Sequence, residues 1–267
     1  MSLEQTVWRI ITPEVKPAAE IVATDDVIHR RVSEGKSPPT VVFYHWKPSV
    51  SIGKPQAISD LNLDACREYG LDIVRTPGGG RAVLHLGTKD ISYSVIGPSN
   101  GLNHVQVYER FCGRIAEAIQ YLGIPVTIDN KNDFYVNGRK ISGNALRINE
   151  GVITQHGIIL CEPHDPEMML AIMNPALYGK QDLSELRGRL TSLKEVAPHI
   201  AIGDLVGALQ EKLTEGRYQA GKLTAEEQRE IVAETARYQD PNWFPGNSIR
   251  GLCWLSKGEE RGSLRGN

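Results

Sequence analysis

The chain has 267 residues, 40% of them hydrophobic, and its 30 basic and 32 acidic side chains leave a formal net charge of -2. This length can bury a sizeable core without a metal or disulfide, and the balanced charge without basic runs argues against nucleic acid as a partner. The cysteines are widely spaced, and the sequence has neither a secretory signal pattern nor an apolar run of transmembrane length. We therefore expect a cytoplasmic protein that makes no membrane contact.

The first hundred residues alternate between strand-like and helix-like apolar patterns. A helix over 17–33 has apolar residues at helical spacing, and Gly35 follows its end. Its acidic pair, Asp25 and Asp26, is interpreted as a solvated helix face. The elements predicted in this part are a strand over 6–11, the helix over 17–33, strands over 40–46 and 49–52 separated by Lys47-Pro48, a short helix over 61–69, and strands over 71–74 and 91–96.

The rest of the chain contains two hairpin signals among helices. Asn137-Gly138 lies between two β-rich runs, and residues 149–151 would form the turn of a second hairpin. Hairpins with little strict βαβ alternation predict an α+β fold, a mixed β-sheet flanked by helices. Helices are predicted over 104–122, 167–173, 202–213 and 225–238, with a short strand over 126–128.

The most informative stretch is glycine-rich and reads Arg75-Thr-Pro-Gly-Gly-Gly-Arg81-Ala-Val-Leu-His85. Three consecutive glycines between strands let the main chain come close to the polar atoms of a ligand. The spacing fits neither a Walker loop nor a dinucleotide fingerprint, because the next glycine after Gly80 is Gly87. From the loop alone, a plain hairpin or bulge is as good an interpretation as a ligand-binding loop.

This glycine-rich stretch resembles the lipoyl-binding loop of lipoate-protein ligases and the related octanoyltransferases. The segment Asn132-Asp-Phe-Tyr-Val-Asn-Gly-Arg-Lys140-Ile-Ser-Gly-Asn-Ala-Leu-Arg147 resembles the part of the family that carries its invariant lysine. Gln155-His156-Gly157 resembles the strand that follows. The resemblance covers about residues 8–213 and implies the catalytic-domain fold of biotin and lipoate protein ligases, a mixed sheet flanked by helices.

The resemblance also implies an activity. A lipoate-protein ligase activates lipoate with Mg-ATP to lipoyl-AMP and transfers the lipoyl group to a specific lysine of an acceptor protein. The expected cofactors are ATP and Mg²⁺, with lipoate as substrate. The expected partners are lipoyl domains of the 2-oxoacid dehydrogenase E2 or glycine cleavage H protein type, with a separate accessory protein as a further candidate.

On this resemblance Lys140 is the catalytic residue, a fixed cation near the phosphate and the acyl carbonyl. Without it, an ordinary surface lysine at a hairpin is the simpler interpretation. Arg75 and Arg81 would hold substrate oxygens or else form exposed ion pairs. Asp133 is the candidate Mg²⁺ ligand, although an Asn-Asp pair is also ordinary turn chemistry. The implied substrate- and nucleotide-binding residues are Arg75, Gly78, Gly79, Gly80, Arg81, Ala82, Val83, His85, Asn132, Asp133, Gly143, Ala145, His156 and Gly157.

Some positions depart from the family pattern. Thr76 stands where many relatives have a second arginine, and Leu86 stands where an aspartate usually follows the histidine. The octanoyltransferase branch uses a nucleophilic cysteine just before the lysine segment, and residues 129–138 contain none. We therefore favour the ligase. The alternatives are an octanoyl or lipoyl transferase that uses an acyl carrier protein donor without ATP, and a non-catalytic protein that binds lipoyl-adenylate.

The expected domain organisation has three parts. Residues 1–215 form a lipoate ligase-like catalytic domain, residues 216–255 a C-terminal helical extension, and residues 256–267 a flexible tail. The extension is too short for a second substantial core. We therefore expect either a separate accessory polypeptide or a compact, self-sufficient enzyme.

Overall fold

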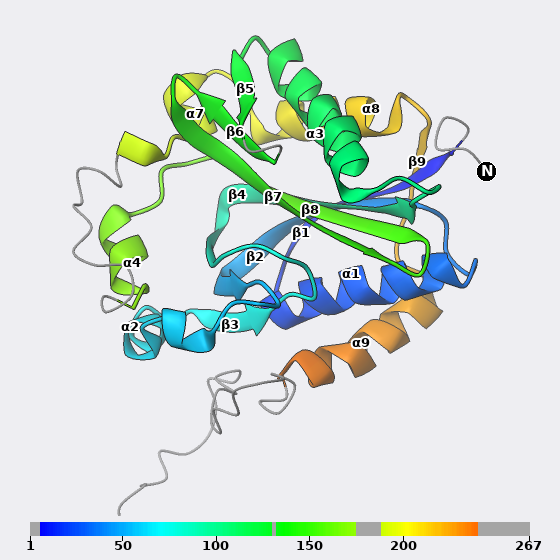
Figure 1. The fold of residues 1–267 in the computed structure, drawn as a ribbon, viewed down its shortest axis with the longest axis horizontal. Coiled ribbons are helices and arrows are strands. Elements are labelled where there is room, and N and C mark those ends of the chain that lie inside the picture. Colours follow the sequence, from blue (N-terminus) through cyan, green and yellow to red (C-terminus); the bar gives the residue numbers. More distant parts are fainter. Residues whose placement is uncertain (1–5, 130–131, 175–187, 240–267) are drawn as a thin grey trace, which may run out of the picture.

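The computed structural model describes residues 6–129, 132–174 and 188–239. A mixed sheet with helices on both faces forms the frame of this part of the chain (Figure 1). The described strands follow the order β5-β6-β7-β8-β4-β2-β1-β9, and β3 pairs with the second half of β2. Pairs among β1, β2, β3 and β9 are parallel, and the other pairs are antiparallel. The strands are β1 (Trp8–Lys16), β2 (Thr40–Ile52), β3 (Asp72–Arg75), β4 (Val83–Pro98), β5 (Val126–Asp129), β6 (Asp133–Val136), β7 (Arg139–Asn149), β8 (Val152–Leu160) and β9 (Tyr218–Ala220).

The long helices form a layer on each face of the sheet. On one face lies α1 (Ala18–Ser33), with α9 (Ala225–Gln239) packed along it, while α3 (His104–Tyr121) and α8 (Ile202–Thr214) cover the other face (Figure 1). In the described part of the chain, no helix has the length and apolarity needed to cross a membrane. The short helices are α2 (Leu63–Glu68), α4 (Pro166–Ala171) and α7 (Leu193–Val196).

Successive residues of the central strands point to opposite faces of the sheet and so contribute to two hydrophobic layers. Phe43 of β2 and Tyr93 of β4 pack with Phe111 of α3 in the larger core. Val42 and Tyr44, the neighbours of Phe43, belong instead to the core beneath α1. Because successive strand residues point to opposite faces, one continuous apolar strand supplies both layers.

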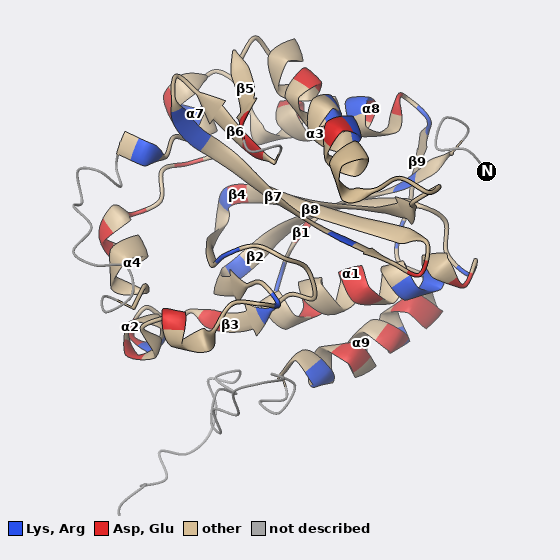
Figure 2. Ribbon diagram, in the orientation of Figure 1, with Lys and Arg blue, Asp and Glu red and all other residues tan. Residues whose placement is uncertain are grey.

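Charged pairs attach α9 to the first strand and the first helix. Glu227 has no exposed surface and accepts two hydrogen bonds of 2.8 Å from the guanidinium of Arg9. Burial opposes ionisation of Glu227, but the hydrogen bonds from Arg9, Ser37 and Thr224 lower its pKa to about 2. Figure 2 shows acidic segments of α9 beside basic segments of α1, where Arg31 forms further ion pairs. The helical part of the expected extension therefore packs on the sheet domain. The proposed boundaries stay a prediction, and residues 240–267 lie outside the described residues.

The predicted α+β fold and most predicted elements are confirmed. Asn137 and Gly138 have φ angles of 50° and 76°, as a two-residue hairpin turn requires. One difference is that β2 continues through Lys47-Pro48, because shifts in its pairing with β4 on both sides of Trp46 absorb the interruption. Further differences are β4, which begins at Val83 rather than at residue 91, the short helix α7, which was not predicted, and β9, whose three exposed residues carry no apolar pattern.

Candidate active site

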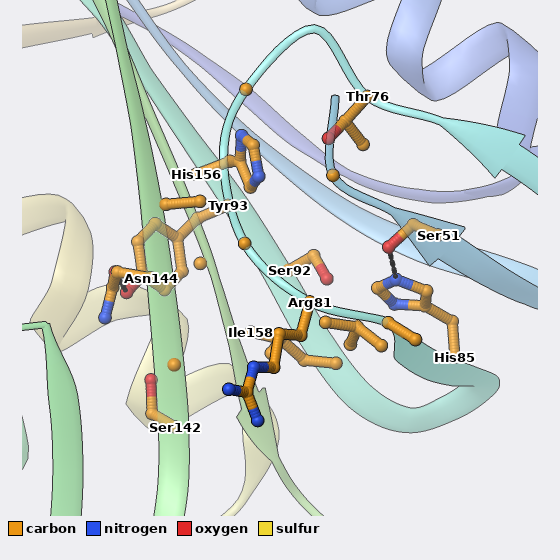
Figure 3. A pocket seen from close by; sticks show the side chains of 18 of the residues that line it. Ser51, Thr76, Arg81, His85, Ser92, Tyr93, Ser142, Asn144, His156 and Ile158 are labelled. Atoms are coloured by element: carbon orange, nitrogen blue, oxygen red, sulfur yellow. Dashed lines mark hydrogen bonds between the residues drawn. The ribbon is translucent and has the colours of Figure 1, made fainter. Parts of the chain in front are cut away.

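A cavity of about 430 Å³ lies between the glycine-rich segment and the sheet (Figure 3). Strands β2, β4, β7 and β8 form its floor, residues 76–82 form its roof, and α1 contributes at one end. Apolar side chains such as Val83, Leu84 and Ile158 line it together with a few polar groups. This size and composition are typical of a site for a small molecule with an apolar part.

The roof depends on glycine at three positions. A Cβ on Gly53 would lie 2.3 Å from the carbonyl oxygen of Gly80, and one on Gly78 would lie 3.0 Å from the His156 ring. Gly80 itself has a φ of 103°, which side chains disfavour. The roof is fastened where the Lys54 N–H donates a 2.8 Å hydrogen bond to the Gly78 carbonyl. Close packing therefore explains Gly53 and Gly78, and the positive φ explains Gly80.

Arg75 lies behind this roof and is not among the residues that line the cavity. Its Nη1 donates hydrogen bonds of 2.9, 3.0 and 2.6 Å to the main-chain carbonyls of Gly53, Lys54 and Gln56. This placement corrects the expectation that Arg75 binds substrate oxygens, because its guanidinium instead holds the 53–56 turn against β3. Arg81, in contrast, is exposed at the cavity (Figure 3).

Lys140 and Asp133 form an ion pair at the cavity. The Lys140 Nζ lies 2.8 Å from the Asp133 Oδ2, and the two side chains are 35% and 21% exposed. They come from β7 and β6, which the Asn137-Gly138 turn joins. A Cβ on Gly143 would lie 3.2 Å from the Lys140 Nζ, so this glycine leaves room for the ammonium. Lys140 is thus a cation with a defined position in the cavity wall.

Asp133 therefore already has a cationic partner. Mg²⁺ commonly binds through one or two carboxylates together with substrate phosphates, and Asp133 offers a carboxylate of that type. Among the described residues, no group of three or more His, Cys, Asp or Glu side chains is arranged to hold a metal. The assignments of Mg²⁺ to Asp133 and of ATP to this site stay predictions.

A buried hydrogen bond crosses over the strand that carries Gly157. Gly157 pairs with Tyr93 on one side and Asn144 on the other, and the Tyr93 hydroxyl donates to the Asn144 Oδ1 at 2.5 Å. A Cβ at residue 157 would lie 2.3 Å from the Tyr93 Oη, so only glycine fits beneath this bond. Asn144 and Asn132 also exchange hydrogen bonds of 2.7 and 2.9 Å. The network fixes Asn132, the residue that precedes Asp133.

A second buried polar group lies around His85. The His85 Nε2 is 3.0 Å from the Ser51 Oγ (Figure 3). The His85 Nδ1 is 3.8 Å from the Asp90 Oδ1. The Trp46 ring stacks on the imidazole at a centroid distance of 4.1 Å. Asp90 has no exposed surface and also accepts a 3.0 Å hydrogen bond from the Leu86 N–H. Asp90 thus supplies a carboxylate beside the histidine, although Leu86 occupies the position where the family usually has one.

At the α1 end of the cavity, Asp25 accepts hydrogen bonds of 2.5 Å from the Tyr44 and Ser94 hydroxyls. The carboxyl opens into the cavity but is removed from bulk water, and this burial raises its pKa to about 6. Burial likewise lowers the pKa of His156 to about 4, so that its ring is neutral at neutral pH. The interpretation of Asp25 as part of a solvated helix face is wrong, because the sheet and α1 enclose it.

The structure brings the other predicted site residues together. Lys140, Gly78, Gly79, Gly80, Arg81, Ala82, Val83, His85, Asn132, Asp133, Gly143, Ala145, His156 and Gly157 all line the cavity. Their roles in binding and catalysis stay predictions. Among the polar groups at or beside the cavity that the sequence did not single out as site residues are Ser51, Asp90, Asn144 and Asp25. Asn144 lies inside the recognised lysine segment, and the others carry no motif that marks them.

No cysteine in the described part of the chain lines the cavity. Cys112 and Cys161 are buried, and burial raises the pKa of each thiol to about 12. Cys66 is buried against β3, with a pKa raised to about 11 by burial. Thiols with such pKa values are protonated at neutral pH and are poor nucleophiles. Cys253 lies outside the described residues.

Comparison with known proteins identifies a family and similar proteins for this chain. Residues 17–214 match the family described as lipoyl protein ligase A/B catalytic domain. The chain is 32% identical to octanoyltransferase LipM of Geobacillus kaustophilus, over 90% of this chain and 99% of that relative. It is 34% identical to octanoyltransferase LipM of Lysinibacillus sphaericus, over 72% of this chain and 78% of that relative.

The fold is similar to that of solved lipoate protein ligases. The bipartite lipoate protein ligase of Thermoplasma acidophilum superposes with a TM-score of 0.81 and 20% identity, covering 95% of this chain and 99% of that one. At this identity the similarity establishes the fold only. It confirms the sheet architecture expected from the sequence.

Proposed function

Because the chain belongs to the lipoyl protein ligase A/B catalytic domain family, we propose that it transfers an octanoyl group from the thioester of an acyl carrier protein to a lysine of a lipoyl-domain protein, without ATP. The observation that carries this proposal is the 32% identity to an octanoyltransferase over 99% of that relative's length.

The sequence-based expectation of an ATP-dependent lipoate-protein ligase is wrong, because the relatives that match along most of their length are octanoyltransferases. The expectation rested on the absence of a cysteine from residues 129–138. That absence removes one nucleophile at one position. It does not remove transfer from a thioester, since a thioester is already activated and needs no adenylation.

The cavity suits a saturated acyl chain. Side chains such as Leu84, Ile158 and Met169 line its interior, and burying each CH₂ of the chain there would contribute about 0.8 kcal/mol. The Gly79 and Gly80 N–H groups donate no hydrogen bond within the described residues. They are therefore available to an acyl carbonyl at the roof of the cavity.

Lys140 would act on the same carbonyl. Negative charge develops on the carbonyl oxygen when a nucleophile attacks, and a positioned ammonium stabilises that charge most effectively where water is limited. Asp133 holds the Lys140 Nζ at 2.8 Å and so limits the rotamers of a long side chain. Because Lys140 is partly exposed, an acceptor lysine can reach the carbonyl beside it.

The test is the intact mass of a lipoyl domain after incubation with this protein and octanoyl acyl carrier protein. We expect an octanoyl adduct without ATP. Lys140→Ala should slow transfer by about 10²-fold or more. Lys194→Ala is the matched control, because Lys194 is also a lysine paired with one acidic residue, Glu162, but is exposed and outside the cavity. A lipoyl domain modified only with lipoate and Mg-ATP would refute the proposal.

A further inference from the structure

We propose that Ser51 is the nucleophile of this transfer, with His85 as its general base and Asp90 as the residue that positions His85. The inference rests on the proposed function for the identity of the acyl group. It assigns an acyl-serine intermediate to a cavity in which, among the described residues, no cysteine is available.

In space, the three side chains are arranged as a nucleophile, a base that contacts it, and a carboxylate on the far side of the base. The Ser51 Oγ lies 3.0 Å from the His85 Nε2, within hydrogen-bond distance, and Ser51 and His85 both line the cavity (Figure 3). On the opposite side of the imidazole, the Nδ1 faces the Asp90 Oδ1 at 3.8 Å. Within the described part of the chain, neither of these two atoms has another hydrogen-bond partner. A small movement of the imidazole would close this contact.

Asp90 is suited to orient the histidine. Burial disfavours its charged form, but the neighbouring imidazoles of His164 and His85 and the Leu86 N–H outweigh burial and lower its pKa to about 2. An ionised carboxylate only accepts hydrogen bonds, so it favours the tautomer with the proton on the His85 Nδ1. The Nε2 is then free to accept the Ser51 hydroxyl proton. Trp46, stacked on the ring, restricts its rotation.

The fold holds these groups on rigid elements. Ser51 lies on β2 and His85 on β4, and these strands pair at Ser49 with His85 and at Ser51 with Val83. Sites built on paired strands hold their geometry better than sites on loops. The glycine roof, whose Gly79 and Gly80 amides are described above, forms the other wall of the cavity.

The reaction balances without a further reagent. The Ser51 Oγ attacks the thioester carbonyl carbon while the His85 Nε2 takes the hydroxyl proton. The carbon–sulfur bond then breaks, and the thiol leaves with the proton from His85. In the second half the neutral amine of the acceptor lysine attacks the ester, the carbon–oxygen bond breaks, and His85 passes a proton from the amine to Ser51. The products are an amide, a free thiol and the original serine.

The first experiment uses the full-length protein and an octyl fluorophosphonate, which forms a stable phosphonyl ester with an activated serine by loss of fluoride. Peptide mass spectrometry locates the adduct, and we expect it at Ser51. Ser51→Ala and His85→Gln should each lower the labelling rate by at least about 10²-fold. Ser49→Ala is the matched control, because Ser49 is a buried serine on the same strand that does not line the cavity.

The second experiment measures octanoyl transfer from the carrier protein to a lipoyl domain. Ser51→Ala should lose at least about 10²-fold in rate. Ser51→Cys should form an octanoyl adduct that neutral hydroxylamine removes, as it does a thioester. Asp90→Asn, the test of the positioning residue, should change the pH profile of labelling as well as lower its rate, because the amide can donate to the His85 Nδ1 and no longer favours the tautomer whose Nε2 accepts the Ser51 proton.

The outcomes separate the two proposals. If Ser51→Ala transfers octanoate at the wild-type rate, or if the label lies on another residue such as Lys140, the serine mechanism is refuted while the transferase proposal stands. If Ser51 is labelled but wild-type protein never modifies the lipoyl domain, the assignment of Ser51 as a nucleophile is supported and the proposed octanoyl transfer is refuted. Circular dichroism of each variant shows whether a loss of rate reflects unfolding.

Discussion

Gly157→Ala provides the sharpest test of how the cavity floor is held. The new Cβ would lie 2.3 Å from the Tyr93 Oη and 2.4 Å from the Asn144 Oδ1, far inside normal contact distances. The Tyr93 hydroxyl and the Asn144 side chain must therefore move apart, which breaks their hydrogen bond. Forcing a methyl into this space costs about 1–3 kcal/mol, and leaving a buried polar group without its partner costs a further 1–3 kcal/mol or so.

We take about 3 kcal/mol as the expected loss in the free energy of unfolding, which corresponds to a fall in Tm of about 6–12 °C for a chain of this size. Differential scanning calorimetry at pH 7 measures it. Gly143→Ala is the matched control, because its Cβ would contact the flexible end of Lys140 at 3.2 Å. It should change Tm by less than about 3 °C but slow transfer, since it displaces the ammonium.

A double-mutant cycle tests the cause. With Tyr93→Leu both ring-end atoms near the new Cβ, the Oη at 2.3 Å and the Cζ at 2.6 Å, are absent and Asn144 can rotate away, so adding Gly157→Ala should lower the free energy of unfolding much less than it does in the wild-type background. Equal costs in the two backgrounds, or a Tm within about 2 °C of wild type for Gly157→Ala alone, would refute this explanation of the glycine.

Three further changes test other parts of the structure. Gly53→Ala should push the Gly80 carbonyl outward and slow octanoyl transfer by about 10-fold or more, with little effect on urea unfolding of the sheet; an unchanged rate would contradict the packing of the roof. For Asp25, whose folded pKa of about 6 lies above its unfolded value, the stabilising contribution is present at acidic pH and is lost as pH rises through about 6. The stability of wild type relative to Asp25→Asn should therefore fall by up to about 3 kcal/mol between pH 4 and pH 7, and a flat difference in urea unfolding would refute the raised pKa. Glu227→Ala leaves Arg9 buried without its carboxylate and should cost about 3–5 kcal/mol, measured by urea unfolding, whereas a loss below about 1 kcal/mol would show that α9 is not held by this pair.

Local patterns predicted the elements that depend on nearby residues. The helix at 104–121 follows from its apolar periodicity, and the hairpin at Asn137-Gly138 follows from the positive φ angles that these two residues tolerate. The glycine-rich loop and the lysine segment were also found, because their residue types are unusual and close together in the chain. These features identified the family.

The activity was inferred incorrectly because it depended on one missing residue. The absence of a cysteine from one segment says nothing about a nucleophile that another strand supplies. Ser51 and His85 are 34 residues apart, and their contact depends on the register between β2 and β4. Nothing in either local sequence fixes that register.

The sequence by itself therefore determined the α+β architecture, the glycine loop and the Asn137-Gly138 hairpin beside Lys140, since each reflects local periodicity or backbone conformation. Tertiary structure alone decided which polar groups meet. It directed Arg75 to main-chain carbonyls, enclosed Asp25, and placed Asp90 beside His85. The physical reason is that burial and strand register determine the partner of a polar side chain, and both depend on residues far away in the chain.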